Sequence, residues 1–363
     1  MIIIKFMADF HNLRIADIYK ETEDTSVITF DVPEELHQEF AFHQGQHLTL
    51  KADINDEDVR RSYSLCSSPI DKQWKVAVKQ IPDGKFSTFV NEELKTGDTL
   101  EVMAPSGVFG IECQPEKAKN YLFFAAGSGI TPVLSMVKTH LEVEPNSTCK
   151  LFYVNKTAKS IIFKEELEQL RNTYFGRFEI YYFLTKERRD IELFNGRFDE
   201  EKMKILTKTF IDIPDTNEVF LCGPEKMINF VSDYLVDAGL SKDLVHFELF
   251  VKGLSEEDIK RAERLAQQNV EGTEVTIVDG GKEFLFTMTK EFDNILDAAL
   301  NAGADLPFAC KGGVCSTCKC EVKEGEVEMK INYALDEKEV SQNLVLSCQA
   351  VPTTDKVVVD FDV

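Results

Sequence analysis

Short runs in which apolar and polar residues alternate occupy the chain from about residue 9 to residue 112. LRIADIYK, HLTLKAD and WKVAVKQI are typical, and turn-forming sequences such as IPDGK and KTGD separate them. A period of two indicates strands with one buried face, and turns at short intervals favour an antiparallel barrel or sandwich. We therefore predict a β-barrel domain at residues 1–115.

The pattern changes in the second third of the chain, at about residues 118 to 250. Continuous apolar runs (YLFFAAG, KLFYVN, FEIYYFLT, EVFLCGP) alternate with helix-like stretches such as TPVLSMVKTHLEVE. Strands that are apolar along their whole length are buried on both faces, and helices between them are typical of a parallel α/β sheet. We therefore predict a Rossmann-like α/β domain at residues 116–250.

A polar segment, GLSEEDIKRAERLAQQNVEG, follows at residues 251–270. Ser255 and Asp258 have the spacing of a capping box, and the apolar residues after them fall on one helical face. We interpret the segment as a helical linker between domains. A peripheral helix packed on the second domain is the alternative.

The remaining residues, 271–363, are again rich in strands, such as EVTIVD, EFLFTMT and KVVVDFDV. One helix-like stretch, NILDAALNAG, precedes a loop that contains several cysteines. This mixture predicts a small α+β domain at the end of the chain.

Composition narrows the possible functions. The chain has 363 residues and a formal net charge of −22, which argues against a nucleic-acid partner because phosphate groups need a basic surface. The opening sequence MIIIKFMADF breaks its apolar run at Lys5, so it predicts neither a secretory signal nor a membrane span. We expect a cytoplasmic protein without a membrane partner, in which clustered cysteines bind metal more often than they form disulfides.

The sequence CKGGVCSTCKC carries the clearest chemistry. Cys310, Cys315 and Cys318 are spaced C-x4-C-x2-C, and Cys348 lies further on in VLSCQA. This is the plant-type spacing for a [2Fe–2S] cluster, whose two irons need four thiolates. Zinc is the main alternative, but structural zinc sites usually pair two C-x2-C knuckles and only one is present. We expect Cys320 to be a small core residue instead, on the buried face of a strand.

A one-electron cluster cannot accept hydride, so an upstream flavin is expected. The sequence RSYSLCSSP at residues 61–69 resembles the R-x-Y-S-x-x-S-x-P signature of the ferredoxin–NADP reductase family, and GKFS resembles its flavin-phosphate loop. The resemblance implies that Arg61 pairs with the FAD diphosphate, Tyr63 stacks on the flavin and Ser64 lies near its N5 atom. The other FAD-binding residues that we expect are Ser62, Lys79, Gly84, Phe86 and Ser87.

The second domain carries two further motifs of the same family. GSGITP follows an apolar strand, so Gly127 and Gly129 permit a tight turn and close approach of a phosphate before a helix. In VFLCGPEKM the resemblance places Cys222 beside the position of hydride transfer, and in HFELF it places Glu248 near the flavin ring. We take Ser64, Cys222 and Glu248 as the candidate catalytic residues. The remaining residues of these motifs that we expect to bind cofactor are Ile130, Thr131, Pro132, Gly223, Pro224 and Phe250.

The choice between NADPH and NADH rests on the sequence that follows the predicted strand KLFYVN. Sites for NADH usually place an acidic residue there to bind the ribose hydroxyls. This chain has Asn155, Lys156 and Thr157, with no acid before Glu165. The family's NADPH users commonly show N-R-[ST] at this point, so the chain departs from the motif but keeps the positive charge at Lys156. We expect NADPH, with NADH as the open alternative.

The segment before the last cysteine ligand indicates the electron acceptor. GEVEMKINYALDEKEVSQNLVLSCQAVP resembles the corresponding segment in reductase subunits of phenylacetyl-CoA epoxidase. The resemblance implies a β-grasp ferredoxin domain and a role in phenylacetate catabolism, with a di-iron oxygenase as partner. Residues 271–363 contain eighteen Asp or Glu against eight Lys and no Arg, which suits a partner with a basic docking face.

Two alternatives remain open from the sequence. The first is a reductase for another oxygenase, a desaturase or a hybrid-cluster protein, which would use the same motifs. The second is an iron–sulfur redox sensor with vestigial nucleotide domains, although the four intact cofactor motifs count against it.

Overall fold

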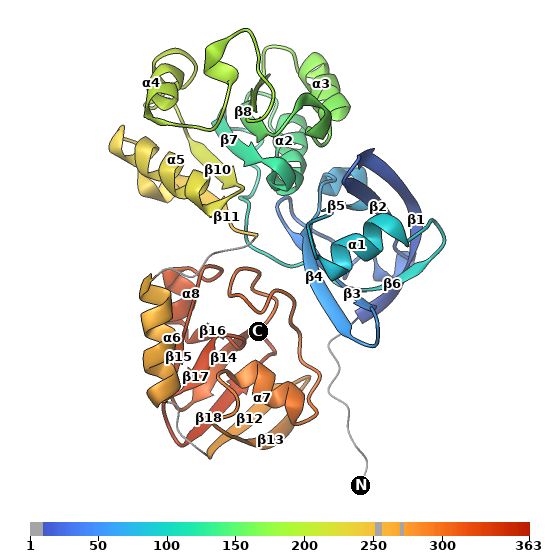
Figure 1. Ribbon diagram of the computed structural model, residues 1–363, viewed down its shortest axis with the longest axis vertical. Helices are drawn as coiled ribbons and strands as arrows, with labels where there is room; N and C mark the ends of the chain where they lie inside the picture. The colour runs from blue at the N-terminus through green and yellow to red at the C-terminus, as the bar shows by residue number, and fades with distance from the viewer. Residues whose placement is uncertain (1–9, 251–255, 269–271) are drawn as a thin grey trace. The chain divides into compact units, whose positions relative to one another are not determined.

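The computed structural model describes residues 10–250, 256–268 and 272–363, and Figure 1 labels its elements. The chain divides into two compact units. One consists of Asn12–Val59 and Tyr63–Phe250, and the other takes in Arg60–Ser62 and the C-terminal part of the chain. Among the described residues, no helix is both long and apolar enough to cross a bilayer.

The first domain consists of β1 (Phe10–Thr22), β2 (Thr25–Asp31), β3 (His47–Asp53), β4 (Asp58–Ser64), β5 (Trp74–Lys79), α1 (Lys85–Glu92) and β6 (Thr99–Met103). Its strands are ordered β4-β3-β6-β1-β2-β5, with antiparallel pairing between β1 and β2, β2 and β5, and β3 and β6. A bridge between Leu65, just after β4, and Val76 of β5 joins the two ends of the sheet. The predicted antiparallel barrel is therefore confirmed.

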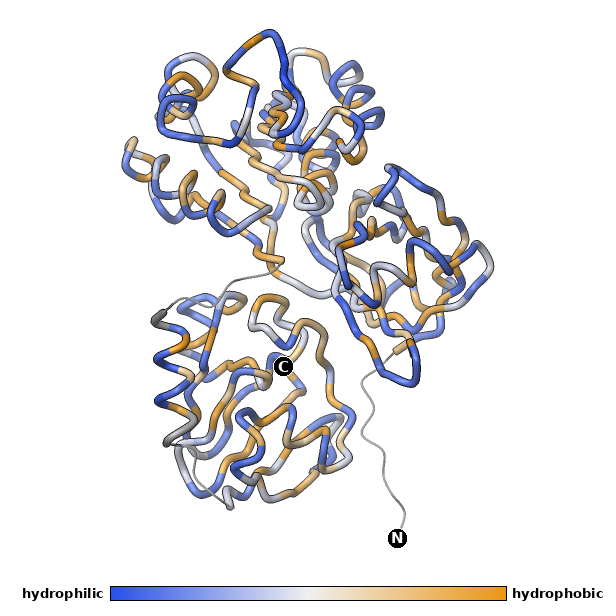
Figure 2. The backbone as a smooth tube through the Cα atoms, in the orientation of Figure 1, coloured by the Kyte–Doolittle hydropathy of each residue, from blue (hydrophilic) through white to orange (hydrophobic). Residues whose placement is uncertain are grey.

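The second domain consists of β7 (Asn120–Ala126), α2 (Ile130–Val143), β8 (Thr148–Asn155), α3 (Lys164–Thr173), β9 (Phe178–Leu184), α4 (Glu200–Thr209), β10 (Glu218–Cys222), α5 (Glu225–Asp237) and β11 (Val245–Glu248). Its five strands are all parallel, in the order β11-β10-β7-β8-β9. Large side chains of the central strands, such as Phe123, Phe124 and Phe152, are fully buried, and Figure 2 shows hydrophobic segments in the interior of the domain. The predicted α/β sheet is confirmed.

The third domain consists of β12 (Thr273–Asp279), β13 (Lys282–Met288), α7 (Ile295–Asn301), β14 (Lys319–Glu324), β15 (Val327–Met329), α8 (Glu337–Ser341), β16 (Leu344–Leu346), β17 (Ala350–Pro352) and β18 (Lys356–Asp360). Its larger sheet has the order β13-β12-β18-β14-β16, in which β12 and β18 are parallel and the other pairs are antiparallel. Cys320 lies on β14 and is fully buried in the core, as predicted.

The segment that we interpreted as a linker contains helix α6 (Glu256–Gln268). The predicted helix is present, and its side chains contact the third domain. The hydroxyl of Tyr333 donates to Asp258, at 2.7 Å, and Arg264 pairs with Glu328. Leu265 is fully buried. Ser255, the other half of the predicted capping box, lies outside the described residues.

Candidate active site and iron–sulfur centre

The three candidate catalytic residues meet where the barrel contacts the parallel sheet. Ser64 ends strand β4, and its hydroxyl donates to Glu248 Oε2 at 3.3 Å. Glu248 is the last residue of β11 and is the register partner of Cys222, the last residue of β10. Residues that lie 184 positions apart in sequence therefore share one site at the carboxyl ends of parallel strands, which is where such sheets bind ligands.

Burial sets the protonation of this site. It raises the pKa of Glu248 to about 8, although the hydrogen bond from Ser64 works in the opposite direction. Burial and the nearby charge of Glu248 also raise the pKa of Cys222 well above that of an ordinary thiol. At neutral pH the site therefore offers a carboxyl group that is largely protonated and a thiol that does not ionise.

The two glycine-containing turns of the second domain pack directly on each other. Gly127 adopts φ +54°, a left-handed conformation that favours glycine. At Gly129 a Cβ atom would lie 2.2 Å from the backbone oxygen of Cys222, so no larger residue fits. The predicted GSGITP and CGP motifs are thus brought together at the carboxyl edge of the sheet, which is the place for a dinucleotide phosphate.

The side chains of the residues after these glycines are buried or stabilise the turns, and do not point toward a ligand. Ile130, Thr131 and Pro132 are buried at the start of α2, and the Thr131 hydroxyl donates to the backbone oxygen of Ser128 at 3.0 Å. Pro224 is the N-cap of α5 and holds the chain extended before the helix. We still expect these segments to contact cofactor mainly through backbone groups.

The end of β8 contains a residue that the sequence analysis did not select. Asn155 is 5% exposed, and its Nδ2 atom has no hydrogen-bond partner among the described residues. A buried donor without an acceptor is costly unless a ligand supplies one. Lys156 follows with an exposed side chain. The signal in the sequence was the Asn-Lys-Thr motif, in which we weighed only the charge.

The predicted flavin loop adopts a helix start. Gly84 is the N-cap of α1, so the first backbone N–H groups of that helix are available to a phosphate. The Ser87 hydroxyl donates to the Gly84 carbonyl and accepts from the Ile81 N–H, at 3.1 and 3.2 Å, which orders the loop. Phe86 is fully buried, so it contributes its backbone and not its ring.

Further predicted flavin residues lie nearby on strands. Tyr63 is half-buried on β4, with its ring 5.7 Å from that of Phe86. Lys79, at the end of β5, pairs with Asp24 at 3.2 Å. Arg61 has an exposed side chain and Ser62 is half-buried, both on β4. Phe250 follows β11 and is 37% exposed, as a residue facing a ligand would be.

The four predicted cluster ligands come together in two pairs. The thiol of Cys310 interacts with that of Cys315, and the thiol of Cys318 with that of Cys348. Two pairs of thiols match the requirement of a [2Fe–2S] cluster, in which each iron takes two protein sulfurs. Cys318 and Cys348 are buried, whereas the first pair is partly exposed.

The loop around the cluster ligands favours negative charge on sulfur. The backbone N–H of Gly312 donates to Cys310 Sγ at 3.3 Å. The hydrogen bond from the Cys315 thiol, together with that N–H, lowers the pKa of Cys310 to about 5. Gly313 has φ +75°, and a Cβ there would approach the Ile331 carbonyl to 3.2 Å. These features fit a metal-bound thiolate loop better than a set of inert core thiols.

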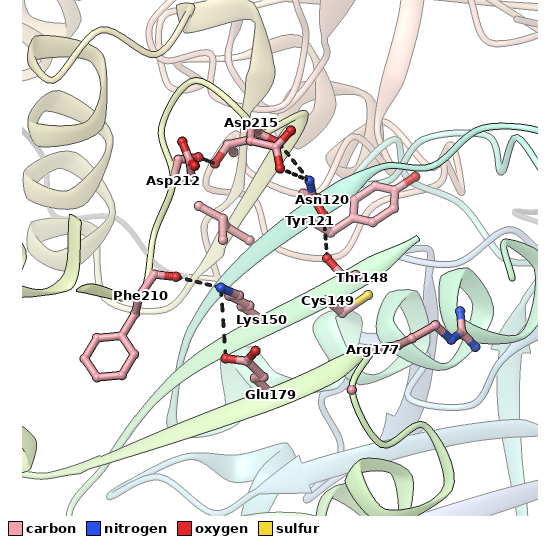
Figure 3. A pocket seen from close by; sticks show the side chains of 13 residues that line it. Asn120, Tyr121, Thr148, Cys149, Lys150, Arg177, Glu179, Phe210, Asp212 and Asp215 are labelled. Atoms are coloured by element: carbon pink, nitrogen blue, oxygen red, sulfur yellow. Dashed lines mark hydrogen bonds and ion pairs between the residues drawn. The ribbon is translucent and has the colours of Figure 1, made fainter. Parts of the chain in front are cut away.

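The cavity drawn in Figure 3 lies at the opposite edge of the parallel sheet, among the amino ends of β7, β8 and β9. Its volume is about 260 Å³, and none of the predicted cofactor residues lines it. Its polar groups are paired with protein: Lys150 donates to the Phe210 carbonyl at 2.8 Å, and Asn120 to Asp215 at 2.7 Å. This cavity is not the coenzyme site.

The sequence matches three domain families in the predicted order. An oxidoreductase FAD-binding domain matches residues 12–111, an oxidoreductase NAD-binding domain matches 123–233, and a 2Fe-2S iron-sulfur cluster binding domain matches 277–353. The expected flavin, nicotinamide and iron–sulfur domains are therefore all present.

Individual relatives share the whole arrangement. The chain is 42% identical to a subunit of the 1,2-phenylacetyl-CoA epoxidase of Escherichia coli (strain K12), over 98% of this chain and 99% of that protein. It is 34% identical to the ferredoxin reductase component of 3-ketosteroid-9-alpha-monooxygenase of Rhodococcus rhodochrous, over 96% of each. The fold is that of phthalate dioxygenase reductase, with a TM-score of 0.58, 24% identity and coverage of 97% of this chain and 98% of that one. The chain therefore belongs to the same family as this epoxidase subunit, a family of oxidoreductases with FAD-binding, NAD-binding and [2Fe–2S] domains.

Proposed function

We propose that this chain is the reductase component of a multicomponent oxygenase, taking hydride from NADPH and passing single electrons to its partner. The observation that carries the proposal is the meeting of Ser64 on the barrel with Cys222 and Glu248 at the edge of the parallel sheet. A flavin held by the barrel and a nicotinamide held by the sheet would be adjacent only at this junction. Bound FAD converts a two-electron donor into single electrons, and a [2Fe–2S] cluster carries them onward.

The protein's own residues have distinct roles in this scheme. Ser64 presents a hydroxyl toward the flavin N5 position and holds the Glu248 carboxyl by a hydrogen bond. Glu248 keeps a proton at neutral pH, which avoids a negative charge beside the flavin. Cys222 is fully buried as a thiol and keeps water from the reacting atoms.

NADPH is the proposed coenzyme. Lys156 offers a positive charge at the end of β8, where a 2′-phosphate would lie, and no carboxylate follows before Glu165. The unpaired Nδ2 of Asn155 adds a donor at the same place. Higher catalytic efficiency with NADH than with NADPH would overturn this choice.

The proposed acceptor is a di-iron oxygenase that epoxidises the ring of phenylacetyl-CoA. The relationship to a subunit of that epoxidase supports it. The acidic C-terminal domain supports a partner with a basic docking face. Oxygenases that act on other substrates, desaturases and hybrid-cluster proteins are the competing acceptors.

A two-stage experiment tests the function. In the first stage the purified holoprotein is titrated anaerobically with NADPH and then with NADH while its visible spectrum is recorded. Bleaching of both flavin and iron–sulfur bands is expected. A preparation without flavin or without iron would refute the proposal, and one that holds iron but no flavin would favour a sensor. In the second stage the reduced protein is mixed with the epoxidase oxygenase and phenylacetyl-CoA. Turnover only with a different oxygenase would refute the acceptor but keep the reductase assignment.

A further inference from the structure

Three side chains of metal-binding type meet away from the cofactor sites. Cys113 lies in the connection between β6 and β7, His140 in the last turn of α2, and Glu144 directly after that helix. Cys113 Sγ is 3.5 Å from His140 Nδ1, which is 3.4 Å from Glu144 Oε1, and all three ligand atoms lie within 4.8 Å of one another. His140 and Glu144 are fully buried, and Cys113 is partly exposed.

The spacing of these atoms fits a tetrahedral zinc ion. Zn–S bonds of about 2.3 Å and Zn–N or Zn–O bonds of about 2.0–2.2 Å place neighbouring tetrahedral ligands about 3.3–3.6 Å apart. The two measured separations, 3.5 and 3.4 Å, are of that length. Two of the three sides of the ligand triangle therefore already have the length that a zinc ion needs, and the third is at most 4.8 Å.

Charge balance favours a cation at the same point. The carboxyl oxygens of Glu144 accept hydrogen bonds from the backbone N–H of Gln114, at 2.7 Å, and from the hydroxyl of Tyr121, at 2.8 Å. Among the described residues no Lys or Arg forms an ion pair with this carboxylate, and Arg177 instead donates to the backbone oxygen of Glu144. The hydrogen bonds from Gln114 and Tyr121 come from neutral donors, which stabilise the buried carboxylate without balancing its charge. A thiolate and a carboxylate together balance a divalent cation, so the metal would leave the buried site neutral.

The surrounding residues hold the three side chains in place, while the Nε2 atom of His140 has no hydrogen-bond partner among the described residues. The Tyr121 ring stacks on the His140 ring, with centroids 4.2 Å apart. Gln44, which precedes β3 in the barrel, lies with its amide nitrogen 3.5 Å from Cys113 Sγ and donates to the Ile111 carbonyl at 2.6 Å. The cluster is therefore preorganised by both domains of its unit.

We propose that Cys113, His140 and Glu144 bind one Zn²⁺ ion, with Cys113 as the thiolate and a water molecule in the fourth position. Binding releases the thiol proton to solvent. The ion fixes the connection between β6 and β7 to the end of α2, so its role is structural and separate from electron transfer.

The test uses holoprotein with full flavin and iron content. Zinc is added, excess is removed by gel filtration, and zinc per chain is measured by elemental analysis and by X-ray absorption at the zinc edge. One retained zinc is expected, with one sulfur at about 2.3 Å and the remaining ligands at about 2.0–2.1 Å. Cys113→Ser should weaken zinc binding at least about tenfold. The control is Cys66→Ala, which removes a buried thiol that belongs neither to the proposed zinc site nor to the iron–sulfur loop. It should leave zinc binding unchanged.

Several outcomes would overturn the proposal. They are no retained zinc, equal affinity in Cys113→Ser, or a shell of four sulfurs, which would place the ion on the cysteines of the iron–sulfur loop. If Cys113→Ser does not fold, the melting temperature of the wild-type holoprotein, with and without zinc, tests whether the site exists. Zinc should raise it and a chelator should reverse the change, and an unchanged melting temperature contradicts the site.

Discussion

At the residue scale, the position of Glu248 explains its chemistry. It ends β11 opposite Cys222, and its carboxyl group accepts the hydrogen bond of Ser64. Glu248 is half-buried, and the lost hydration raises its pKa to about 8. The group is therefore mostly protonated below pH 8 and negative above it.

The first prediction concerns this titration. The rate constant of flavin reduction by NADPH should fall as the pH rises through about 8, because a negative carboxylate beside the flavin opposes the arrival of hydride. Glu248→Gln keeps a neutral side chain at every pH, so its rate constant should lose this pH dependence. Stopped-flow absorbance across pH 6–10 measures it. An inflection that survives in Glu248→Gln would assign the titration to another group.

The second prediction separates two neighbouring cysteines. Cys348→Ser should remove the iron–sulfur absorbance while NADPH still reduces the flavin, since one of four ligands is lost. Cys320→Ser should keep the cluster, because Cys320 lies in the hydrophobic core and not in the loop. Iron content and visible spectra of both variants decide. Loss of the cluster only in Cys320→Ser would show that the ligand assignment is wrong.

Individual residues also show how much of the candidate site could be predicted from the sequence. The cysteine spacing selected four candidate ligands, and the structure brings their thiols together in two pairs. Asn155 was missed because an unpaired donor becomes visible only when its neighbours are placed. The Cys113, His140 and Glu144 cluster was missed for a similar reason, since residues 113 and 140 come from separate elements that only the fold brings together.

At the element scale, α2 connects the flavin motif with the nucleotide turn. The Ser135 hydroxyl donates to the backbone oxygen of Ser67 at 2.7 Å, and the Thr139 and Ser68 hydroxyls are 2.9 Å apart. Lys138 adds an ion pair to Asp71 at 2.6 Å. Residues 67, 68 and 71 closely follow the RSYS sequence of β4, while the start of α2 forms the GSGITP turn. The helix thus links the loop after β4 to the GSGITP turn, the two segments that we expect to lie beside the two cofactors.

The third prediction follows from this contact. The double variant Ser135→Ala and Thr139→Val removes three buried hydrogen bonds: the two to the loop after β4, and one from the Thr139 hydroxyl to the Ser135 carbonyl at 2.6 Å. Each is worth about 1 kcal/mol, and the variant should slow flavin reduction by NADPH about tenfold without loss of FAD. Thr207→Val on α4 is the control, since its hydroxyl likewise donates to the carbonyl four residues earlier, at 2.8 Å. An unchanged rate constant in the double variant would show that the contact only adds stability.

Elements were easier to predict than their packing. The pattern of apolar residues located the strands of the barrel and of the parallel sheet. Burial on one face gives alternating polar and apolar residues, and burial on both faces gives continuous apolar runs. Helix α6 shows the limit. Its charged composition favoured a linker, whereas Tyr333 and Glu328, more than sixty residues further on, hold it to the third domain.

At the scale of the whole molecule, charge is unevenly distributed. The segment 271–363 carries a net charge of −10. In this domain helix α8 packs against β16, the strand that leads to Cys348. Glu337 on α8 is exposed, so acidic groups are available to a partner close in the chain to the last cluster ligand.

The fourth prediction concerns association with the oxygenase. The rate of electron delivery to it should fall steeply with added salt, because screening shortens the Debye length from about 10 Å at 0.1 M to about 3 Å at 1 M. Glu337→Lys should slow delivery several-fold at low salt and leave flavin reduction unchanged. Glu200→Lys, at the exposed start of α4, is the matched control and should have no effect. A salt-independent rate would refute electrostatic docking.

The bridge between Leu65 and Val76 has a consequence for folding. Leu65 immediately follows the four residues RSYS, so the strand that we expect to bind the flavin also closes the barrel. We therefore expect flavin binding and closure of the barrel to be coupled. Release of fluorescent flavin on heating would then report when the barrel opens, and a tightly held flavin would protect the N-terminal domain from unfolding.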